Sequence, residues 1–132
     1  MDEVVKFLEE NPVFYIATVD GDTPKVRPFG FFLKHQQKLY FGVGNQKETF
    51  KQLQKNPKFE ISTTSKDNTW LRLSGNAVFE TSEELLEKAF ERNPNLKALY
   101  SKENGPRLEL FYIENAKAEF LNFLGEHKVI NF

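Results

Sequence analysis

The alternation of apolar and polar residues predicts a mainly β protein with a few amphipathic helices. In residues 70–79, Leu71 and Leu73 alternate with polar positions, which is typical of a strand with one buried face. In Asp2–Glu10 the apolar residues recur instead at helical spacing. The same reasoning predicts strands at residues 13–19, 25–33, 39–43, 59–64, 70–79, 108–113 and 117–123.

Three further helices are expected between these strands. Breaks and caps place them from Gly44-Asn45 to Asn56-Pro57, from a capping box at Thr81 and Glu84 through Arg92, and from Asn93-Pro94 to about Tyr100. The nine residues after Phe123 are expected to form a tail. No connection among the first strands is long enough for a parallel crossover, so the strands should be antiparallel. The prediction is an α+β antiparallel barrel with peripheral helices; the alternative is an open sheet covered on one face.

Composition narrows the classes of function. The 132 residues fit one domain, and 18 basic against 19 acidic residues, scattered without a basic block, do not favour a surface for duplex nucleic acid. The absence of cysteine excludes disulfides and thiol catalysis, and two histidines make a protein-held zinc site unexpected. Without a signal peptide or an apolar run of membrane-spanning length, a cytoplasmic protein is expected. The 14 phenylalanines suggest a subunit interface or a flat aromatic ligand.

The strand predicted at residues 25–33 contains two residues that should interrupt its pairing. Pro28 has no N–H to donate and Gly30 has no side chain to pack. On one face of this strand, Arg27, Phe29 and Phe31 place a guanidinium beside aromatic rings. This combination suits a planar, anionic ligand. The alternative is an edge strand whose arginine reaches out to solvent.

The helix after Gly44-Asn45 begins in a way that favours an anion. Lys47 and Thr49 lie in its first turn, where unpaired backbone N–H groups and the helix dipole attract negative charge. Alternatively, Asn45 and Glu48 only cap the helix while Lys47 stays in solvent. Because the strand before this helix follows the Arg27 strand through a tight turn, Arg27 and the helix start are expected to converge on one phosphate.

Trp70 is the single tryptophan, and it lies on the polar face of its strand beside Arg72. Trp70 is therefore expected to lie in an interface, to form part of a ligand-binding wall, or to be a half-buried residue with a structural role only. No nucleophile can be assigned, since the chain lacks cysteine and a GxSxG motif and neither histidine has an obvious triad partner. No catalytic residue is predicted, and a cofactor must supply any reactivity.

Three segments together carry a resemblance to a known family. VFYIATVDGDTPKVRPFGFFL, LYFGVGNQKETFKQLQKNPKFEIS and TWLRLSGNAVFE resemble the pyridoxamine 5'-phosphate oxidase-like, FMN-binding split-barrel family, in its short general-stress-protein and nitroimidazole-reductase-like branch. The resemblance covers roughly residues 3–125. It implies a six-stranded antiparallel split β-barrel that forms a homodimer, with FMN at the subunit interface.

The resemblance also implies a set of cofactor-binding residues. They comprise a flavin-contacting strand, a neighbouring strand, the phosphate-binding helix start and a position contributed by the partner subunit: Arg27, Pro28, Phe29 and Gly30; Phe41 and Gly42; Lys47 and Thr49; and Trp70. At the last of these positions the longer oxidases place a polar residue. Which of Lys47 and Thr49 carries the phosphate is left open.

The resemblance implies an FMN-dependent oxidoreductase that passes electrons from NADH or NADPH to a small acceptor or another flavin. The family's true pyridoxamine phosphate oxidases carry a C-terminal segment that holds the pyridoxal substrate, whereas this chain ends at LGEHKVINF, so that activity is not expected. The alternatives are a non-enzymatic flavin-holding or stress-response module, and a barrel that binds haem or a deazaflavin. A barrel for single-stranded nucleic acid needs a positive groove, which the near-neutral charge does not favour.

Overall fold

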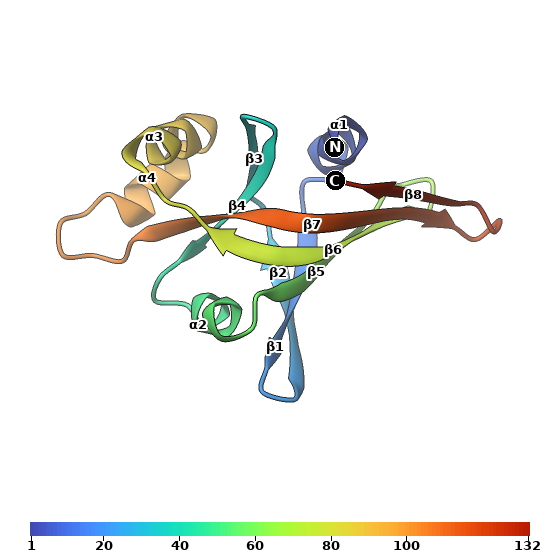
Figure 1. The fold of residues 1–132 in the computed structure, drawn as a ribbon. Coiled ribbons are helices and arrows are strands. Elements are labelled where there is room, and N and C mark those ends of the chain that lie inside the picture. Colours follow the sequence, from blue (N-terminus) through green and yellow to red (C-terminus); the bar gives the residue numbers. More distant parts are fainter.

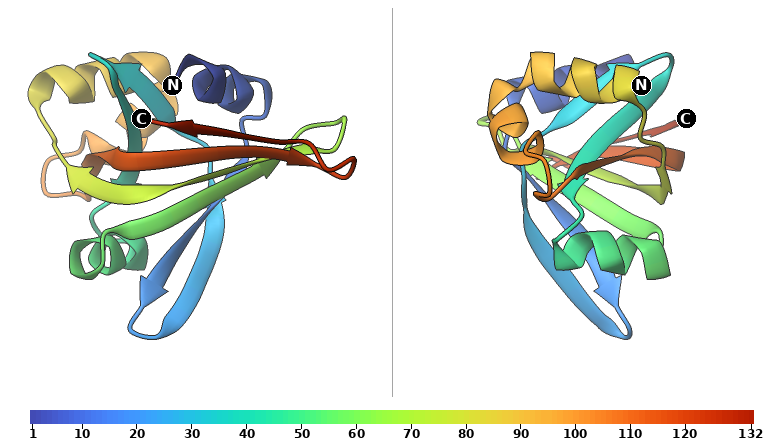
Figure 2. Two further views of the ribbon diagram at one scale, coloured as in Figure 1. Left: turned by 45° about the vertical axis from the view of Figure 1, so that its right-hand side comes forward. Right: turned by 90° about the vertical axis from the view of Figure 1, so that its left-hand side faces the viewer.

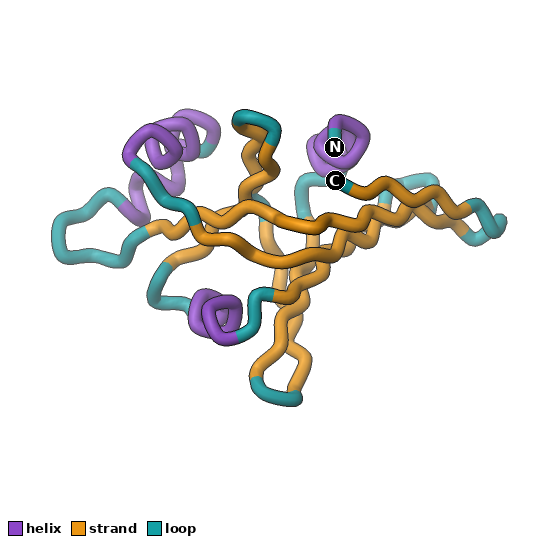
Figure 3. The backbone as a smooth tube through the Cα atoms, viewed as in Figure 1, coloured by secondary structure: helices purple, strands orange, loops and turns teal.

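The computed structural model describes residues 1–132 as a twisted antiparallel sheet with four helices around it (Figures 1 and 3). The strands are Phe14–Asp20 (β1), Thr23–Phe29 (β2), Phe32–His35 (β3), Lys38–Gly44 (β4), Lys58–Thr64 (β5), Thr69–Phe79 (β6), Leu108–Asn122 (β7) and His127–Asn131 (β8). The helices are Asp2–Glu10 (α1), Glu48–Lys55 (α2), Glu83–Arg92 (α3) and Pro94–Tyr100 (α4). None of these helices has the length and apolar character that crossing a membrane requires.

The sheet is open between two strands that are neighbours in the sequence. Its order is β2-β1-β5-β6-β7-β4-β3, and β8 pairs with β7 beside this path. The edge strands β2 and β3 are joined through Gly30-Phe31, yet no ladder links them. The prediction of an antiparallel, mainly β fold with peripheral helices is confirmed, whereas six strands were too few and the sheet is not closed. The expected interruption is absent at Pro28, because pairing with β1 continues through Pro28 to Phe29, and it occurs at Gly30, where the sheet stays open.

The core fills the inside of the curled sheet. Val4 and Leu8 of α1 are fully buried against it, and the rings of Phe14 and Phe59 both pack on Phe41. A second, smaller cluster lies beneath α3 and α4, which sit together at one end of the sheet (Figure 2). Only one of the 14 phenylalanines, Phe123, is exposed, so packing inside one chain accounts for most of this aromatic content.

Two strands that were predicted separately form a single strand in the structure. Residues 108–113 and 117–123 form the continuous strand β7, and the supposed turn at Glu114-Asn115 is a bulge where the pairing with β6 shifts register. Asn115 takes a positive φ of 54° there, as a bulge residue often does. Opposite the bulge, a Cβ on Gly75 would lie 2.8 Å from the Glu114 carbonyl oxygen, which explains the glycine. The predicted tail also has regular structure, because it folds back as β8.

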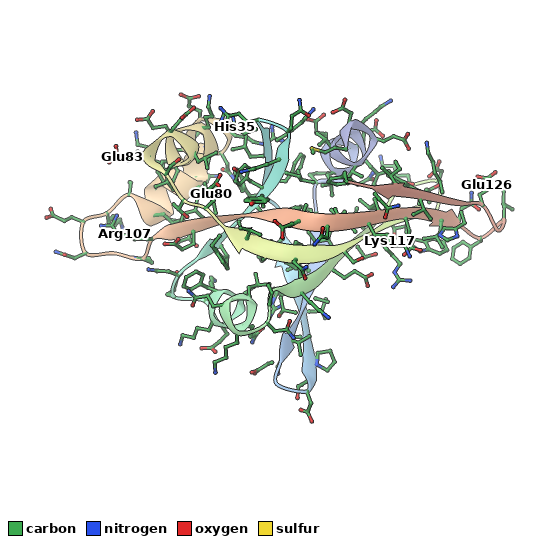
Figure 4. The ribbon with its side chains drawn as sticks, in the orientation of Figure 1. His35, Glu80, Glu83, Arg107, Lys117 and Glu126 are labelled. Atoms are coloured by element: carbon green, nitrogen blue, oxygen red, sulfur yellow. The ribbon has the colours of Figure 1, made fainter.

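Two helix starts differ from their predictions. Ser82, not Thr81, caps α3 by accepting a hydrogen bond from the N–H of Leu85. Lys47 occupies the N-cap position of α2, so Asn45 does not cap this helix. Asn45 instead accepts a hydrogen bond from the N–H of Arg107, in the loop that leads into β7 (Figure 4). The first turn of α2 is therefore left without a side-chain cap.

Candidate functional site

A cleft of about 350 Å³ lies between the edge strand β2 and the end of β4. Residues of β2, of the Gly30-Phe31 link, of the end of β4, of the start of α2 and of α4 line it: Arg27, Pro28, Phe29, Gly30, Phe31, Gly42, Val43, Gly44, Lys47, Thr49, Asn93, Leu96 and Tyr100. Its volume falls in the range of small-molecule sites. The open edge of the sheet thus becomes the wall of a binding cleft.

Arg27 reaches the cleft while being held from behind. Its Nη1 donates to Thr18 Oγ1 at 2.7 Å, and its Nη2 donates to Gln52 Oε1 at 2.7 Å. Longer contacts join Nη1 to the carbonyl oxygens of Lys25 and Ile16. Partial burial of the guanidinium lowers the pKa of Arg27, which nevertheless remains charged at any physiological pH. The Nε–H and the second N–H of Nη2 have no acceptor in the protein.

The start of α2 supplies further unpartnered donors. Thr49 is only 6% exposed and lines the cleft, yet its hydroxyl makes no hydrogen bond within the protein. The backbone N–H groups of Glu48 and Thr49 also find no acceptor, as is usual for a first helical turn without a cap. Lys47 is exposed at the same place and forms no ion pair. Together with Arg27, these groups form a donor set suited to a phosphate.

The other walls of the cleft are apolar or aromatic. Phe29 and Phe31 both line the cleft, and a Cβ on Gly42 would come within 3.2 Å of the Phe31 ring. Gly44 likewise has no room for a side chain, because its Cβ would lie 2.6 Å from the Tyr100 hydroxyl oxygen. The cleft therefore offers donors at one side and flat apolar surface at the other.

The structure brings together seven of the nine predicted site residues. The cleft lining includes Arg27, Pro28, Phe29, Gly30, Gly42, Lys47 and Thr49. Phe41 does not reach the cleft, because its side chain is fully buried in the core. Trp70 does not reach it either: its half-buried ring packs on Phe123, with the ring centroids 5.1 Å apart.

Sequence reasoning missed the part of the site that α4 contributes. Asn93, Leu96 and Tyr100 line the cleft, although the sequence indicated only a short helix there. Leu96 and Tyr100 lie four residues apart, so they share one helical face, and this spacing was the available signal.

Both histidines lie outside this cleft. His35 Nε2 is 3.7 Å from Glu84, and His127 Nε2 is 3.0 Å from Glu119. The hydrogen bond from His127 is the main cause of a lowered pKa for the Glu119 carboxyl. No group of three or more His, Asp or Glu side chains is arranged to hold a metal ion.

Comparison with known proteins supports the family resemblance. Residues 1–122 match the family model described as pyridoxamine 5'-phosphate oxidase. A NimC/NimA family protein from Clostridium acetobutylicum shares 38% identity and superimposes with a TM-score of 0.92, over 100% of this chain and 92% of that one. A search among curated proteins finds no match.

Two solved structures of lower identity share the fold but differ in the ligand that their names give. A FAD-binding protein from Mesorhizobium loti is 14% identical, with a TM-score of 0.62 over 91% of this chain and 94% of that one. A heme binding protein from Mycobacterium smegmatis is 15% identical, with a TM-score of 0.69 over 93% of this chain and 54% of that one. The fold alone therefore does not select the ligand. The match over residues 1–122 does establish the family, and the chain belongs to the pyridoxamine 5'-phosphate oxidase-like family.

Proposed function

We propose that this protein binds FMN in the cleft between β2 and β4 and acts as an FMN-dependent oxidoreductase. The observation that carries the proposal is the unpartnered donor set of Arg27, Thr49 and the first turn of α2, placed beside an aromatic wall. A phosphate dianion would accept hydrogen bonds from these donors and be stabilised by Lys47. The isoalloxazine ring would lie against Pro28, Phe29 and Gly30, with Gly42 providing the close approach.

The site chemistry favours a phosphorylated flavin over haem. Haem iron takes an axial His, Cys, Met or Tyr ligand. Tyr100 is the only lining residue of these types, and its hydroxyl lies over Gly44. A deazaflavin of the same shape would meet the same walls, so FMN and a deazaflavin are separated by the spectrum of the bound cofactor and not by the cleft.

We further propose that a second copy of the chain completes the site. Tyr15 and Val26 project from the outer face of β1 and β2 with 51% and 68% of their surface exposed, and Pro28 on the same face lines the cleft. This apolar face adjoins the cleft, so a partner that covers it would also close one side of the bound ring. Trp70 does not line the cleft of its own chain and would contact the flavin only as Trp70 of a second copy.

The residues of this chain would bind and orient the cofactor and exclude water from the ring. No side chain in the cleft is assigned as a general acid or base, and bound FMN would supply the redox chemistry. We expect NADH or NADPH to be the electron donor and a small molecule or another flavin to be the acceptor. A cytoplasmic location remains part of this proposal.

The absorbance spectrum of freshly purified protein is the first test. Flavin bands support the proposal, a Soret band would replace it with haem binding, and a colourless protein is then titrated with FMN under fluorescence detection. If the protein carries no flavin as purified and also fails to bind added FMN, the proposal is contradicted. Arg27→Ala combined with Lys47→Ala should abolish FMN binding and retain the dimer in light scattering, whereas Lys51→Ala, on the same helix, should change neither.

Turnover separates an enzyme from a flavin-holding module. Anaerobic mixing of the FMN-loaded protein with NADH or NADPH should bleach the flavin absorbance, and adding an acceptor should restore it. If neither nucleotide reduces the bound flavin, the non-enzymatic alternative is favoured and the oxidoreductase proposal fails.

A further inference from the structure

We infer that Thr18 and Gln52 are positioning residues that aim Arg27 and thereby set the preference of the site for phosphorylated over unphosphorylated flavin. This inference rests on the proposed function. Neither side chain is predicted to contact the ligand, and neither lines the cleft between β2 and β4. Both act through the geometry of the guanidinium.

Three side chains from different elements form a closed hydrogen-bonded triangle. The Thr18 hydroxyl on β1 accepts from Arg27 Nη1 and donates to Gln52 Oε1 at 2.6 Å, while Gln52 also accepts from Arg27 Nη2. Thr18 is 1% exposed and Gln52 is 6% exposed. Largely buried polar groups that are paired in this way hold one geometry, because rotation away from it breaks a hydrogen bond that water cannot readily replace.

The triangle leaves one edge of the guanidinium available. Guanidinium has five N–H donors in a rigid plane. The two acceptors of the triangle touch each other, so they occupy the end of the plane between Nη1 and Nη2. The Nε–H and the outer N–H of Nη2 point together from the adjacent edge and have no acceptor. Such an edge can bind two oxygens of one phosphate.

Helix α2 places this edge beside the unpartnered donors of its first turn. Thr49 and Gln52 lie three residues apart and are both buried, so they share the helix face that packs toward β1. Gln52 holds Arg27 by a hydrogen bond, and Arg27 and Thr49 line the same cleft. Without the triangle, the long side chain of Arg27 on an edge strand would be free to turn toward solvent.

The test compares FMN with riboflavin, which lacks the phosphate. Thr18→Val and Gln52→Met preserve side-chain size but remove the hydrogen bonds to Arg27. Each should lower the ratio of FMN to riboflavin affinity by about tenfold, the size expected for weakening one charge-assisted contact. Thr18→Ser keeps the hydroxyl, and Gln54→Met lies on the exposed face of the same helix; both should leave the ratio unchanged.

A double variant tests whether Thr18 acts only through Arg27. In an Arg27→Ala background, Thr18→Val should cause no further fall in the ratio. Thermal unfolding of the cofactor-free variants measures folding separately. If Thr18→Val does not fold, Gln52→Met, which removes the other acceptor of the triangle, decides the question.

The outcomes distinguish the inference from the function on which it depends. If the wild-type protein binds FMN but the variants keep its ratio of FMN to riboflavin affinity, the positioning role alone is overturned. The same holds if the variants lose FMN affinity and riboflavin affinity equally. Wild-type protein that binds neither flavin overturns the proposed function and the positioning role together.

Discussion

Helix α2 separates two clefts of different character, and the larger one lacks the features of a binding site. The larger cleft, about 470 Å³, is lined by the end of β1 and by α2: Val19, Asp20, Gly21, Glu48, Lys51, Gln52, Gln54, Lys55 and Asn56. Val19 is its one apolar residue. The smaller cleft, about 350 Å³, combines aromatic walls with glycines and buried donors. Chemistry, not volume, therefore identifies the candidate site.

The difference lies in how the polar groups of each cleft are held. In the larger cleft, Glu48 and Lys51 are exposed and pair with each other at 3.4 Å, so their charges are already balanced and solvated. In the smaller cleft, Arg27 is fixed by buried partners, and Thr49 is a largely buried residue whose hydroxyl makes no hydrogen bond within the protein. A ligand gains most from donors that are already oriented and desolvated, because it does not have to order them.

The largest effect on flavin affinity is expected from Arg27→Ala in the smaller cleft, compared with a charge removed from the larger cleft. Loss of a charge-assisted contact to phosphate should weaken FMN binding by about 10- to 100-fold and riboflavin binding by less than about threefold. Lys55→Ala, which removes one charge from the larger cleft, should leave both affinities within about twofold. Fluorescence titration with each flavin measures this. Equal effects of the two substitutions would mean that the clefts are not different in function.

Thr49→Val should weaken FMN binding less than Arg27→Ala does, and it should not lower the stability of the cofactor-free protein. The hydroxyl makes no hydrogen bond in the protein, so its removal leaves no group unpaired and the cofactor-free protein should unfold at the same temperature or higher. FMN affinity should fall by roughly fivefold, and Thr49→Ser should retain it. If Thr49→Val lowers stability and leaves FMN affinity unchanged, the hydroxyl is structural and not part of the site.

Gly44→Ala tests the apolar wall of the smaller cleft. The new methyl group would lie 2.8 Å from Tyr100 Cε1, so the Tyr100 ring must move. In the proposed binding mode this wall contacts the flavin ring and not the phosphate, so FMN and riboflavin affinities should fall together by about threefold. A change in FMN affinity alone would place Tyr100 near the phosphate instead.

The fold was largely predictable because its signals are local. Alternation located the strands, and Gly30 marked the place where the sheet opens. The errors came from features that only long-range pairing decides. Glu114-Asn115 has turn-forming residues, but the ladder between β6 and β7 continues past them as a bulge.

The donor end of the site was predictable in part, and its support was not. Lys47 and Thr49 follow from the position of a helix start, and Arg27 from its strand. Thr18 lies within an apolar run, and Gln52 lies in a helix whose visible apolar residues are Phe50 and Leu53. Nothing local marks either polar group as buried, since burial depends on how α2 packs against β1.

The smallest effect on binding is expected from Tyr40→Phe, which tests whether lost stability by itself mimics a site defect. Tyr40 is 2% exposed, and its hydroxyl donates to Glu80 at 2.5 Å, outside both clefts. Its loss should lower the free energy of unfolding by about 1 kcal/mol at pH 7. FMN and riboflavin affinities should stay within about twofold, since neither wall of the smaller cleft loses a contact.

The pH dependence of that stability loss identifies its cause. The hydrogen bond from Tyr40 is the main reason that the pKa of Glu80 is lowered from its ordinary value of 4.5. A lowered pKa in the folded protein means that this stabilisation is complete above about pH 5 and disappears as the pH falls through the lowered value. Urea unfolding of wild type and Tyr40→Phe should therefore differ at pH 7 and converge as the pH falls below the lowered pKa of Glu80. A difference that does not shrink as the pH falls would show that the Tyr40 hydroxyl does not stabilise through ionised Glu80, because the packing of the ring on Tyr112 is retained in Tyr40→Phe.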